Sequence, residues 1–326
     1  MNVLIIGGAG YIGSHVTRRF LDSGHQVKVF DNLSSGLHAN LQKEADFFEG
    51  DILIHGELLE AMSAGYDAVI HLAAFKNAGE SMEIPEIYAQ KNISGTINIL
   101  NAMSEAGIKK FIFSSSSSVY GEPDYLPMDE KHPLIPESFY GFSKLEIERF
   151  LKWYEKLRGI QSVSLRYFNA AGYDPQGRIT GLEQNPSNLI PVVLETAVGV
   201  RDKVLVFGSD YKTRDGSGIR DYVHVTDLSD GHLAALEYLD SQKQSLAVNL
   251  GTERGFTVHE VIESARKITG KEIPVEIVER RAGDPAEVCS SASLAKKLLG
   301  WDPKYCDINS ILETHWKAYL SNFPEN

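Results

Sequence analysis

Tyr140 and Lys144 are spaced so that their side chains could act together on one substrate. They stand four residues apart near the start of a segment with helical periodicity, and residues i and i+4 of a helix share one face. A nearby ammonium favours phenolate over phenol, which would lower the pKa of Tyr140 from its ordinary value of about 10. The pair is therefore a candidate general base, although the same spacing is common on exposed helices.

Ser116 is the third candidate for this chemistry. It lies in the serine run 114–118, directly after an apolar segment that ends at Phe113. A serine hydroxyl both donates and accepts hydrogen bonds, so it could relay a proton between a substrate hydroxyl and Tyr140. A flexible serine-rich linker is the alternative interpretation. The aromatic and β-branched residues on both sides of the run argue against a linker.

A glycine-rich segment near the N-terminus could hold a dinucleotide. Gly7, Gly10 and Gly13 follow an apolar segment and precede a helical one. Such glycines permit a tight turn and close approach of the main chain, and a helix N-terminus offers free N–H groups to a pyrophosphate. Asp31 ends the next apolar segment, where a carboxylate could accept hydrogen bonds from the adenosine ribose and would repel a 2′-phosphate. These residues favour NAD over NADP; a simple surface turn is the alternative.

A parallel sheet would bring these residues to one edge. The first half of the chain alternates short apolar segments with amphipathic ones, which predicts an α/β fold with a doubly wound, Rossmann-like parallel sheet. The expected strands are Asn2–Ile6, Gln26–Asp31, Ala45–Glu49, Ala68–His71, Lys110–Phe113 and Ser162–Arg166. The expected helices lie near Tyr11–Asp22, Glu57–Ala64, Tyr88–Ala106 and Tyr140–Arg158. Ligands of such sheets bind at the carboxyl ends of the strands.

The pattern changes after Phe168. Residues 169–188 are rich in Gly, Pro, Asn and Gln and predict a long functional loop, followed by a helix near Leu189–Gly199 and a strand at Val204–Phe207. We expect a dinucleotide-binding domain over residues 1–168 and a smaller α+β substrate domain over residues 169–326. The segment near 220–238 could pack back on the first domain.

Composition narrows the class of protein. The chain has 326 residues, of which 43% are hydrophobic and 23% charged, as in an ordinary globular protein. A net charge of −12 disfavours sequence-independent binding to nucleic acid, which depends on Lys and Arg. No apolar run is long enough for a membrane helix. Two cysteines cannot form a disulfide framework and have no metal-ligand spacing, so we expect a cytoplasmic protein without a metal.

The motifs together are similar to those of a known family. Gly7–Gly13, Asp31, Ser116, Tyr140 and Lys144 resemble the extended short-chain dehydrogenase/reductase family. Within that family the whole chain resembles the UDP-glucose 4-epimerases. This closer resemblance is carried, in order along the chain, by residues 7–13, 71–76, 113–116, 166–172, 188–191, 220–224 and 281–284.

The resemblance implies a role for many individual residues. For NAD these are Gly7, Gly10, Tyr11, Ile12, Gly13, Asp31, Asn32, Leu33, Ser34, Ser35, Gly36, Asp51, Ile52, Leu72, Ala73, Ala74, Phe75, Lys76, Asn92, Ser116, Tyr140, Lys144 and Phe168. For a UDP-sugar they are Ser116, Tyr140, Asn169, Asn188, Leu189, Phe207, Arg220, Arg281, Asp284 and Val288. Two arginines in the second set would supply local cations for the pyrophosphate. The resemblance also implies a homodimer formed by the long helical segments 88–106 and 140–158.

The activity implied is NAD-dependent interconversion of UDP-galactose and UDP-glucose through a transient 4-keto sugar. A nucleotide-sugar 4,6-dehydratase is one alternative, but dehydratases usually carry Thr-Asp-Glu where this chain has Ser116-Ser117-Ser118. A non-catalytic NAD-sensing module is another, and it would not need Ser116, Tyr140 and Lys144 together. Position 288 limits space near the sugar in this family. Val288 is small, so UDP-GlcNAc and UDP-GalNAc are expected as a second substrate pair.

Overall fold

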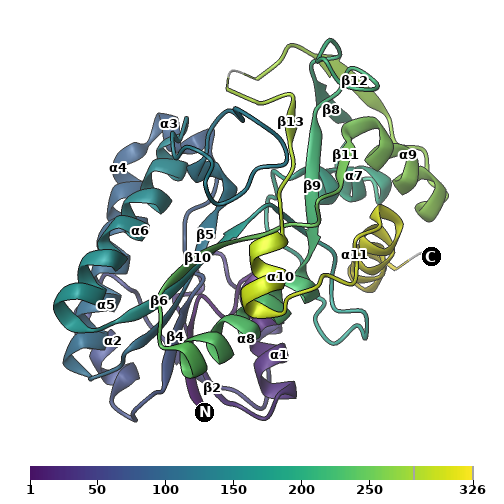
Figure 1. The fold of residues 1–326 in the computed structure, drawn as a ribbon. Coiled ribbons are helices and arrows are strands. Elements are labelled where there is room, and N and C mark those ends of the chain that lie inside the picture. Colours follow the sequence, from purple (N-terminus) through teal and green to yellow (C-terminus); the bar gives the residue numbers. More distant parts are fainter. Residues whose placement is uncertain (282, 325–326) are drawn as a thin grey trace.

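The centre of the molecule is a sheet of seven parallel strands in the order β10-β6-β5-β4-β1-β2-β3 (Figure 1). The structure is a computed structural model that describes residues 1–281 and 283–324. The strands are β1 Asn2–Ile6, β2 Gln26–Asp31, β3 Asp46–Glu49, β4 Ala68–His71, β5 Lys110–Ser116, β6 Gln161–Tyr167 and β10 Leu246–Leu250. The predicted α/β class with a doubly wound parallel sheet is confirmed.

Helices cover both faces of this sheet, so β1, β4, β5 and β6 bury nearly all of their side chains. Val3 and Ile5 pack on the face covered by α1 (Tyr11–Asp22) and α8 (Val225–Gln242). Leu4 and Ile6 pack on the opposite face, which three further helices cover. These are α2 (His55–Met62), α5 (Gly95–Glu105) and α6 (Phe139–Arg158). A continuous apolar run such as residues 3–6 is what a strand buried on both faces requires.

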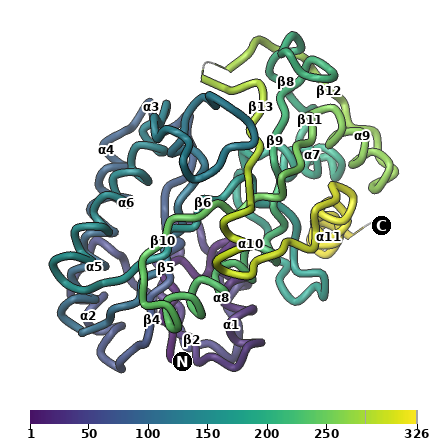
Figure 2. Tube along the Cα trace, viewed as in Figure 1, coloured from purple at the N-terminus to yellow at the C-terminus, as the bar shows by residue number. Residues whose placement is uncertain are grey.

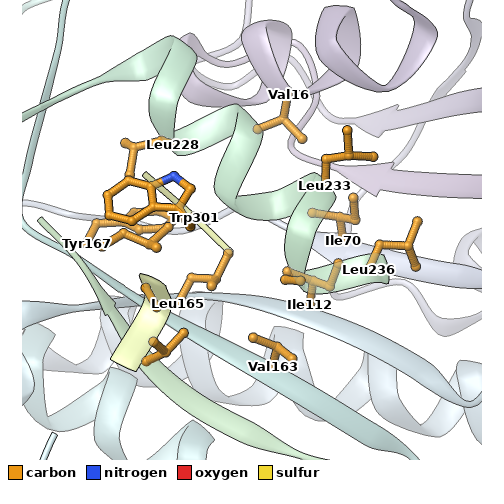
Figure 3. Packing of buried hydrophobic residues seen from close by; sticks show 14 of the residues in the cluster. Val16, Ile70, Ile112, Val163, Leu165, Tyr167, Leu228, Leu233, Leu236 and Trp301 are labelled. Carbon is orange, nitrogen blue, oxygen red and sulfur yellow. The ribbon is translucent and has the colours of Figure 1, made fainter. Parts of the chain in front are cut away.

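The seventh strand, β10, was not among the predicted strands. It comes from residues 246–250 and pairs with β6, so the central sheet takes a strand from beyond residue 168. Helix α8 precedes β10 and packs on the sheet, where Figure 3 shows Leu233 and Leu236 of α8 beside Ile70 and Ile112. The division at residue 168 therefore stays a proposal, and the sheet itself crosses it.

Two other expectations need correction. The strand expected to end at Phe113 continues to Ser116, because the serines keep their pairing with β6 as far as Ser116 opposite Tyr167. The helix expected over 88–106 is not continuous. A π-helical turn, Ala89–Ser94, separates α4 (Pro85–Tyr88) from α5. Such wide turns are rare and often lie at functional sites.

A second group of elements forms beside the carboxyl edge of the main sheet (Figure 2). Its centre is β9 (Ile219–His224), which pairs with β7, β11 and β13, while β8 pairs with β12. The bounds are β7 Asn169–Ala171, β8 Val204–Phe207, β11 Gly255–Thr257, β12 Val275–Val278 and β13 Glu287–Val288. The remaining helices are α3 Glu80–Glu83, α7 Leu189–Ala197, α9 Val258–Thr269, α10 Ser293–Leu299 and α11 Ile308–Asn322. Helices α7, α9 and α11 share a separate hydrophobic core with β8.

Candidate active site

A cavity of about 440 Å³ lies where β1, β2 and β4 end. This volume is in the range of pockets that hold small molecules and cofactors. Most of the residues predicted to bind NAD line it. They are Gly7, Gly10, Tyr11, Ile12, Gly13, Asp31, Asn32, Ser34, Ser35, Asp51, Ile52, Leu72, Ala73, Ala74, Phe75 and Lys76.

The glycine turn is packed so tightly that side chains would not fit. Gly7 has φ +85°, and a Cβ there would lie 2.5 Å from the main-chain nitrogen of Ala73. A Cβ on Gly13 would lie 2.0 Å from the carbonyl oxygen of Gly7. Gly10 precedes α1, and none of the described side chains caps this helix. The first N–H groups of α1 can therefore face an anion, as a pyrophosphate requires.

Asp31 is held in place by its own neighbours. Its carboxylate accepts hydrogen bonds from the main-chain N–H groups of Ala9 (3.0 Å) and Leu33 (2.9 Å). Burial raises the pKa of Asp31, and these two bonds act in the opposite direction. Each carboxylate oxygen can accept a further bond. The carboxylate therefore lines the cavity in an orientation suited to accept from a ribose.

One wall of the cavity was not predicted residue by residue. Leu182, Glu183, Gln184, Asn185 and Ser187 line it from the far side, within the loop that precedes α7. Lys76 and Glu183 form an ion pair across the cavity, with 2.5 Å between Nζ and Oε1. The composition of residues 169–188 indicated a functional loop, but no motif indicated which of its residues face the cofactor side.

The candidate catalytic residues lie at the adjoining end of β5. Ser138 caps α6 by accepting from the N–H of Gly141 (3.1 Å), so Tyr140 enters the site from the first turn of that helix. The N–H of Tyr140 donates to Ser81 Oγ (3.0 Å). Gly141 lies so close to Ser118 that a Cβ there would be 2.2 Å from its carbonyl oxygen. This close approach sets α6 against the serine run that carries Ser116.

Lys144 lies deep in the protein with 3% of its surface exposed. Its ammonium donates to the carbonyl oxygen of Ser114 (2.7 Å) and lies 5.8 Å from the centre of the Tyr140 ring. Burial lowers the pKa of Lys144 to about 7. The side chain is thus fixed between the end of β5 and Tyr140, as the spacing of the two residues predicted.

The pKa of Tyr140 does not follow the prediction. Burial raises it above its ordinary value, and the hydrogen bond with Ser116 is the opposing influence. The expected decrease from Lys144 does not occur. Burial penalises the phenolate form of Tyr140, and it also penalises the ammonium form of Lys144. Without a ligand, Tyr140 is therefore a phenol that shares a hydrogen bond with Ser116. A positive charge brought by a ligand would be needed to favour the phenolate.

Asn92 contacts the protein rather than the cavity. Its amide exchanges two hydrogen bonds of 2.9 Å with the main chain of Phe75, and its Nδ2 also lies 3.2 Å from Ser143 Oγ. The π-helical turn carries Asn92, so this turn ties the segment after β4 to α6. A direct contact between Asn92 and a cofactor stays a prediction.

The other predicted cofactor residues are not among those that line this cavity. Leu33 has φ +56° in the turn after β2, and Gly36 packs against Ala9 and Asp31. Phe168 is buried in the main core just after β6.

The predicted substrate residues come together around β9. Arg220 on β9 forms an ion pair with Asp284, and its pairing partner across the strands is Val288. Asn169 on β7 donates from Nδ2 to the carbonyl oxygen of Asp221 (3.0 Å). Residues that are 119 positions apart in the chain, from 169 to 288, thus meet at one strand.

The remaining substrate candidates fall into two pairs. The Arg281 guanidinium lies 3.7 Å from the centre of the Phe207 ring, a stacked cation–π contact. Ala282, which follows Arg281 in the predicted motif, lies outside the described residues. Asn188 and Leu189 stand at the start of α7, where Asn188 also lines a small cavity beside Tyr11 and Glu183. The loop before α7 therefore connects the two candidate ligand sites.

Across residues 1–281 and 283–324, no group of three or more His, Cys, Asp or Glu side chains is arranged to hold a metal ion. The described helices include none that is long and apolar enough to span a membrane. Cys289 and Cys306 are both free thiols.

The doubly wound sheet, its glycine turn and the Ser–Tyr–Lys group define a dinucleotide-binding protein of the short-chain dehydrogenase/reductase class. The model of the "NAD dependent epimerase/dehydratase family" matches residues 3–251, and the chain belongs to this family.

Relatives and solved structures are similar to this chain over nearly its whole length. A UDP-glucose 4-epimerase from Halalkalibacterium halodurans is 47% identical over 319 residues, which cover 97% of this chain and 95% of the relative. A crystal structure of UDP-glucose 4-epimerase from Brucella ovis in complex with NAD has a TM-score of 0.95, is 41% identical, and covers 98% of both chains. The structure from Bifidobacterium longum in complex with NAD⁺ and UDP has a TM-score of 0.93, 35% identity, and covers 99% of both chains.

Proposed function

We propose that this chain is an NAD-dependent 4-epimerase that interconverts UDP-galactose and UDP-glucose. The observation that carries the proposal is the position of Tyr140. Its phenol is bonded to Ser116 at the end of β5, Lys144 lies beneath it, and the dinucleotide cavity adjoins it through Ser114. The full-length similarity to UDP-glucose 4-epimerases supports the same activity.

The cavity fits NAD on structural grounds. A Cβ on Gly7 or Gly13 would collide with main chain, so the glycines keep the turn open to a pyrophosphate. Asp31 faces the cavity with free acceptor capacity for a ribose. NAD, when bound, would supply a reversible acceptor for the hydride of the sugar C4 and a positive charge that favours the phenolate form of Tyr140. Asp51 and Lys76 line the same cavity and would complete the site.

Tyr140 acts as the base in this proposal. Its phenol oxygen takes the proton of the sugar 4-hydroxyl as the C4 hydrogen leaves as hydride, and it returns that proton when the hydride comes back to the opposite face. Ser116 shares a hydrogen bond with Tyr140 and can pass the proton between sugar and phenol. Lys144 holds the geometry of the site through its hydrogen bond to the carbonyl oxygen of Ser114. Protons and hydride both return to the sugar, so no co-substrate is consumed.

The UDP part would be held by the residues around β9. Arg220 is a forked donor suited to a diphosphate, and Asp284 keeps its guanidinium oriented. Arg281 lies on the Phe207 ring and offers a second cation. Asn169, Asn188 and Leu189 complete this set of substrate residues. An anchored UDP would let the 4-keto sugar turn over and present its other face.

The range of sugars is part of the proposal. Val288 stands opposite Arg220 on β13. We infer that its small side chain admits an N-acetyl group, as the family resemblance implies. We expect UDP-GlcNAc and UDP-GalNAc to be interconverted as well. Replacing Val288→Tyr should reduce turnover of the N-acetylated pair selectively. Unchanged N-acetyl turnover in this variant would contradict the role of Val288.

The assembly and location that we propose are a homodimer in the cytoplasm. One face of α6 exposes Phe142 (40%), Trp153 (57%) and Leu157 (60%), an apolar stripe at helical spacing. Two free thiols and no disulfide among the described residues are typical of a reducing compartment. Light scattering after size exclusion tests the dimer. Trp153→Glu should yield monomers if the stripe is the interface, and an unchanged mass would exclude it.

The central experiment needs no added cofactor. Purified protein is incubated with UDP-galactose, and separately with UDP-GalNAc, and the products are analysed by chromatography. We expect conversion of each to its 4-epimer by cofactor that stays bound during purification. Adding NAD distinguishes an empty site from an inactive one. Protein that binds NAD but converts neither sugar contradicts the proposed activity.

A further inference from the structure

Asp221 is a buried carboxylate next to the residue proposed to bind the diphosphate. It follows Arg220 on β9, and successive side chains of a strand point to opposite faces. Arg220 reaches toward Asp284, whereas Asp221 points inward and has 0% of its surface exposed. It belongs to the segment 220–224 that carried the family resemblance, but no role was predicted for it.

The carboxylate of Asp221 binds two other segments of the chain. Thr252 donates to it from the main-chain N–H (2.9 and 3.1 Å) and from Oγ1 (2.6 Å). Ser290 donates to it from N–H (3.1 Å) and from Oγ (2.6 Å). The three segments are so close that a Cβ on Gly251 would lie 1.8 Å from Ser290 Oγ. One side chain thus joins β9, the turn after β10 and the end of β13.

A buried carboxylate without a cation partner is an unfavourable way to stabilise a fold. Burial raises the pKa of Asp221, and the donors from Thr252 and Ser290 oppose that rise. Among the described residues no cation pairs with it, so hydrogen bonds alone compensate its charge. Apolar residues of similar volume often replace buried charges with no loss of stability. A geometric role explains why this position would keep a carboxylate.

The geometry that Asp221 controls is that of the substrate residues. Ser290 comes two positions after Val288, which lies opposite Arg220 in the strand pairing. The N–H of Ile219 donates to the carbonyl oxygen of Ala286 (2.9 Å), so the 284–290 segment runs along β9. Its other side is bound by Met128, whose N–H donates to the carbonyl oxygen of Cys289 (2.9 Å). The hydrogen bonds from Ser290 to Asp221 hold the end of this segment against β9.

We propose that Asp221 is a positioning residue that sets the affinity for the UDP-sugar by holding the 284–290 segment, and with it Asp284 and Val288, in register with Arg220. This inference rests on the proposed function, because it assigns those three residues to the UDP-sugar. Asp221 does not touch the substrate in this proposal, and it acts only through the strands it joins.

The test replaces Asp221→Asn in the full-length protein. The amide keeps the shape but places an NH₂ group against donors from Thr252 and Ser290. We expect the KM for UDP-galactose and the Kd for UDP by calorimetry to rise roughly tenfold, the equivalent of one or two lost hydrogen bonds. The kcat at saturation and the content of bound NAD should change less than about threefold.

Asp227→Asn is the matched control. Asp227 is also buried (1% exposed), and it also accepts from two main-chain N–H groups, those of Lys304 (3.0 Å) and Tyr305 (2.9 Å). Its described hydrogen bonds join α8 to the segment before α11 and not to β9 or β13. This variant should lose thermal stability while KM and the UDP Kd stay unchanged. It therefore separates a general effect of removing a buried carboxylate from a positioning effect.

Ser290→Ala provides a second variant if Asp221→Asn does not fold. It removes one donor and leaves the carboxylate, so the UDP Kd should rise in the same direction by a smaller factor, about two- to fivefold. If wild type binds UDP and both variants bind it equally well, the positioning role is wrong. Wild type that binds no UDP instead contradicts the proposed function, so the two failures are distinguishable.

Discussion

The proposed cofactor side and the proposed substrate side of the molecule are built in different ways. The cofactor side uses consecutive segments: β1, the glycine turn and α1 follow one another, and Asp31 ends the next strand. The substrate side collects Asn169, Arg220 and Val288 from distant parts of the chain onto β9. Local geometry thus determines the glycine turn of the first site, whereas the second site depends on long-range strand pairing. Damage to one side should therefore leave the other largely able to bind its ligand.

The largest expected effect comes from the group between the two sides. Tyr140→Phe removes the phenol oxygen that is bonded to Ser116 but keeps the buried ring. Loss of a general base lowers kcat by about 10²- to 10⁴-fold. Bound NAD and the Kd for UDP should both stay near wild type, because neither ligand depends on the proton transfer. Turnover of UDP-galactose, NAD content and UDP calorimetry measure the three quantities.

Tyr125→Phe is the control for this variant. Tyr125 is exposed, and its hydroxyl donates to Asp129 (2.7 Å) away from the cavity. Its kcat should match wild type. A Tyr140→Phe enzyme that retains more than about a tenth of the wild-type kcat would assign the proton transfer to another group.

The next effect isolates the substrate side. Arg220→Ala removes a forked cation and leaves Asp284 without its partner, so the Kd for UDP should rise by roughly 30- to 100-fold. NAD content should not change, because the residue lies on β9 and outside the dinucleotide cavity. Arg280→Ala is the control: that guanidinium pairs with Asp210 (2.7 Å) and lies 4.1 Å from the centre of the Tyr211 ring. Equal losses in both variants would indicate a general charge effect.

The contrast between the two sides also explains what the sequence could predict. The bounds of β1, β2, β4 and α1 were predicted to the residue, because each is a local apolar pattern between turn signals. Strand β10 was missed, since a short segment between α8 and a loop is recognised only by the strand it pairs with. Asp221 stands in the segment 220–224 that carried the family resemblance, but its burial and its partners exist only in the folded chain, so no role could be predicted for it.

Burial is also the reason that the pKa of Tyr140 was predicted in the wrong direction. The spacing of Tyr140 and Lys144 was enough to place them together, but it could not show that both are cut off from solvent. Similarly, the loop composition indicated a functional segment, while the ion pair between Lys76 and Glu183 required the two halves to be in place. The π-helical turn at Asn92 had no signal in the helical periodicity.

A substitution in the glycine turn tests the cofactor side. Gly13→Ala places a Cβ 2.0 Å from the carbonyl oxygen of Gly7, so the turn must open. Overpacking of this kind costs about 1–3 kcal/mol, and the displaced N–H groups should lower the NAD content of the purified protein. UDP binding by the folded fraction should persist. Thermal melts and released NAD measure both effects.

Gly56→Ala is the control for the glycine turn. Gly56 lies in α2, and no heavy atom lies within 4 Å of a Cβ built there. Alanine is the better helix former, so stability should rise by about 0.5–1 kcal/mol with NAD content unchanged. If Gly13→Ala behaves like Gly56→Ala, the tight turn is not needed for the cofactor.

The smallest expected effect is on the pH dependence of stability. It concerns the junction of the two sides, where three histidines are buried. His15 of α1, His224 of β9 and His315 of α11 have pKa values lowered by burial to about 4, about 3 and about 3. In the unfolded chain these histidines take up protons as pH falls through about 6.5, whereas in the folded chain they stay neutral at that pH. Their contribution to stability is therefore complete above pH 6.5 and is lost as pH falls from there toward 4 for His15 and toward 3 for His224 and His315. Each histidine can account for up to about 1.4 kcal/mol per pH unit.

His315→Gln should flatten this dependence. The ring Nδ1 of His315 accepts from the N–H of Gly172 (3.2 Å), a role that the neutral ring or an amide oxygen can serve. Urea unfolding at pH 7.5, 6.5 and 5.5 should show a shallower loss for this variant than for wild type, together with a lower stability at pH 7.5. His55→Gln, an exposed position beside Glu105, should keep the wild-type slope. Equal slopes for all three proteins would mean that groups outside this junction cause the loss of stability at low pH. Protonation of the buried histidines would then not limit the stability of the contact between the two sides.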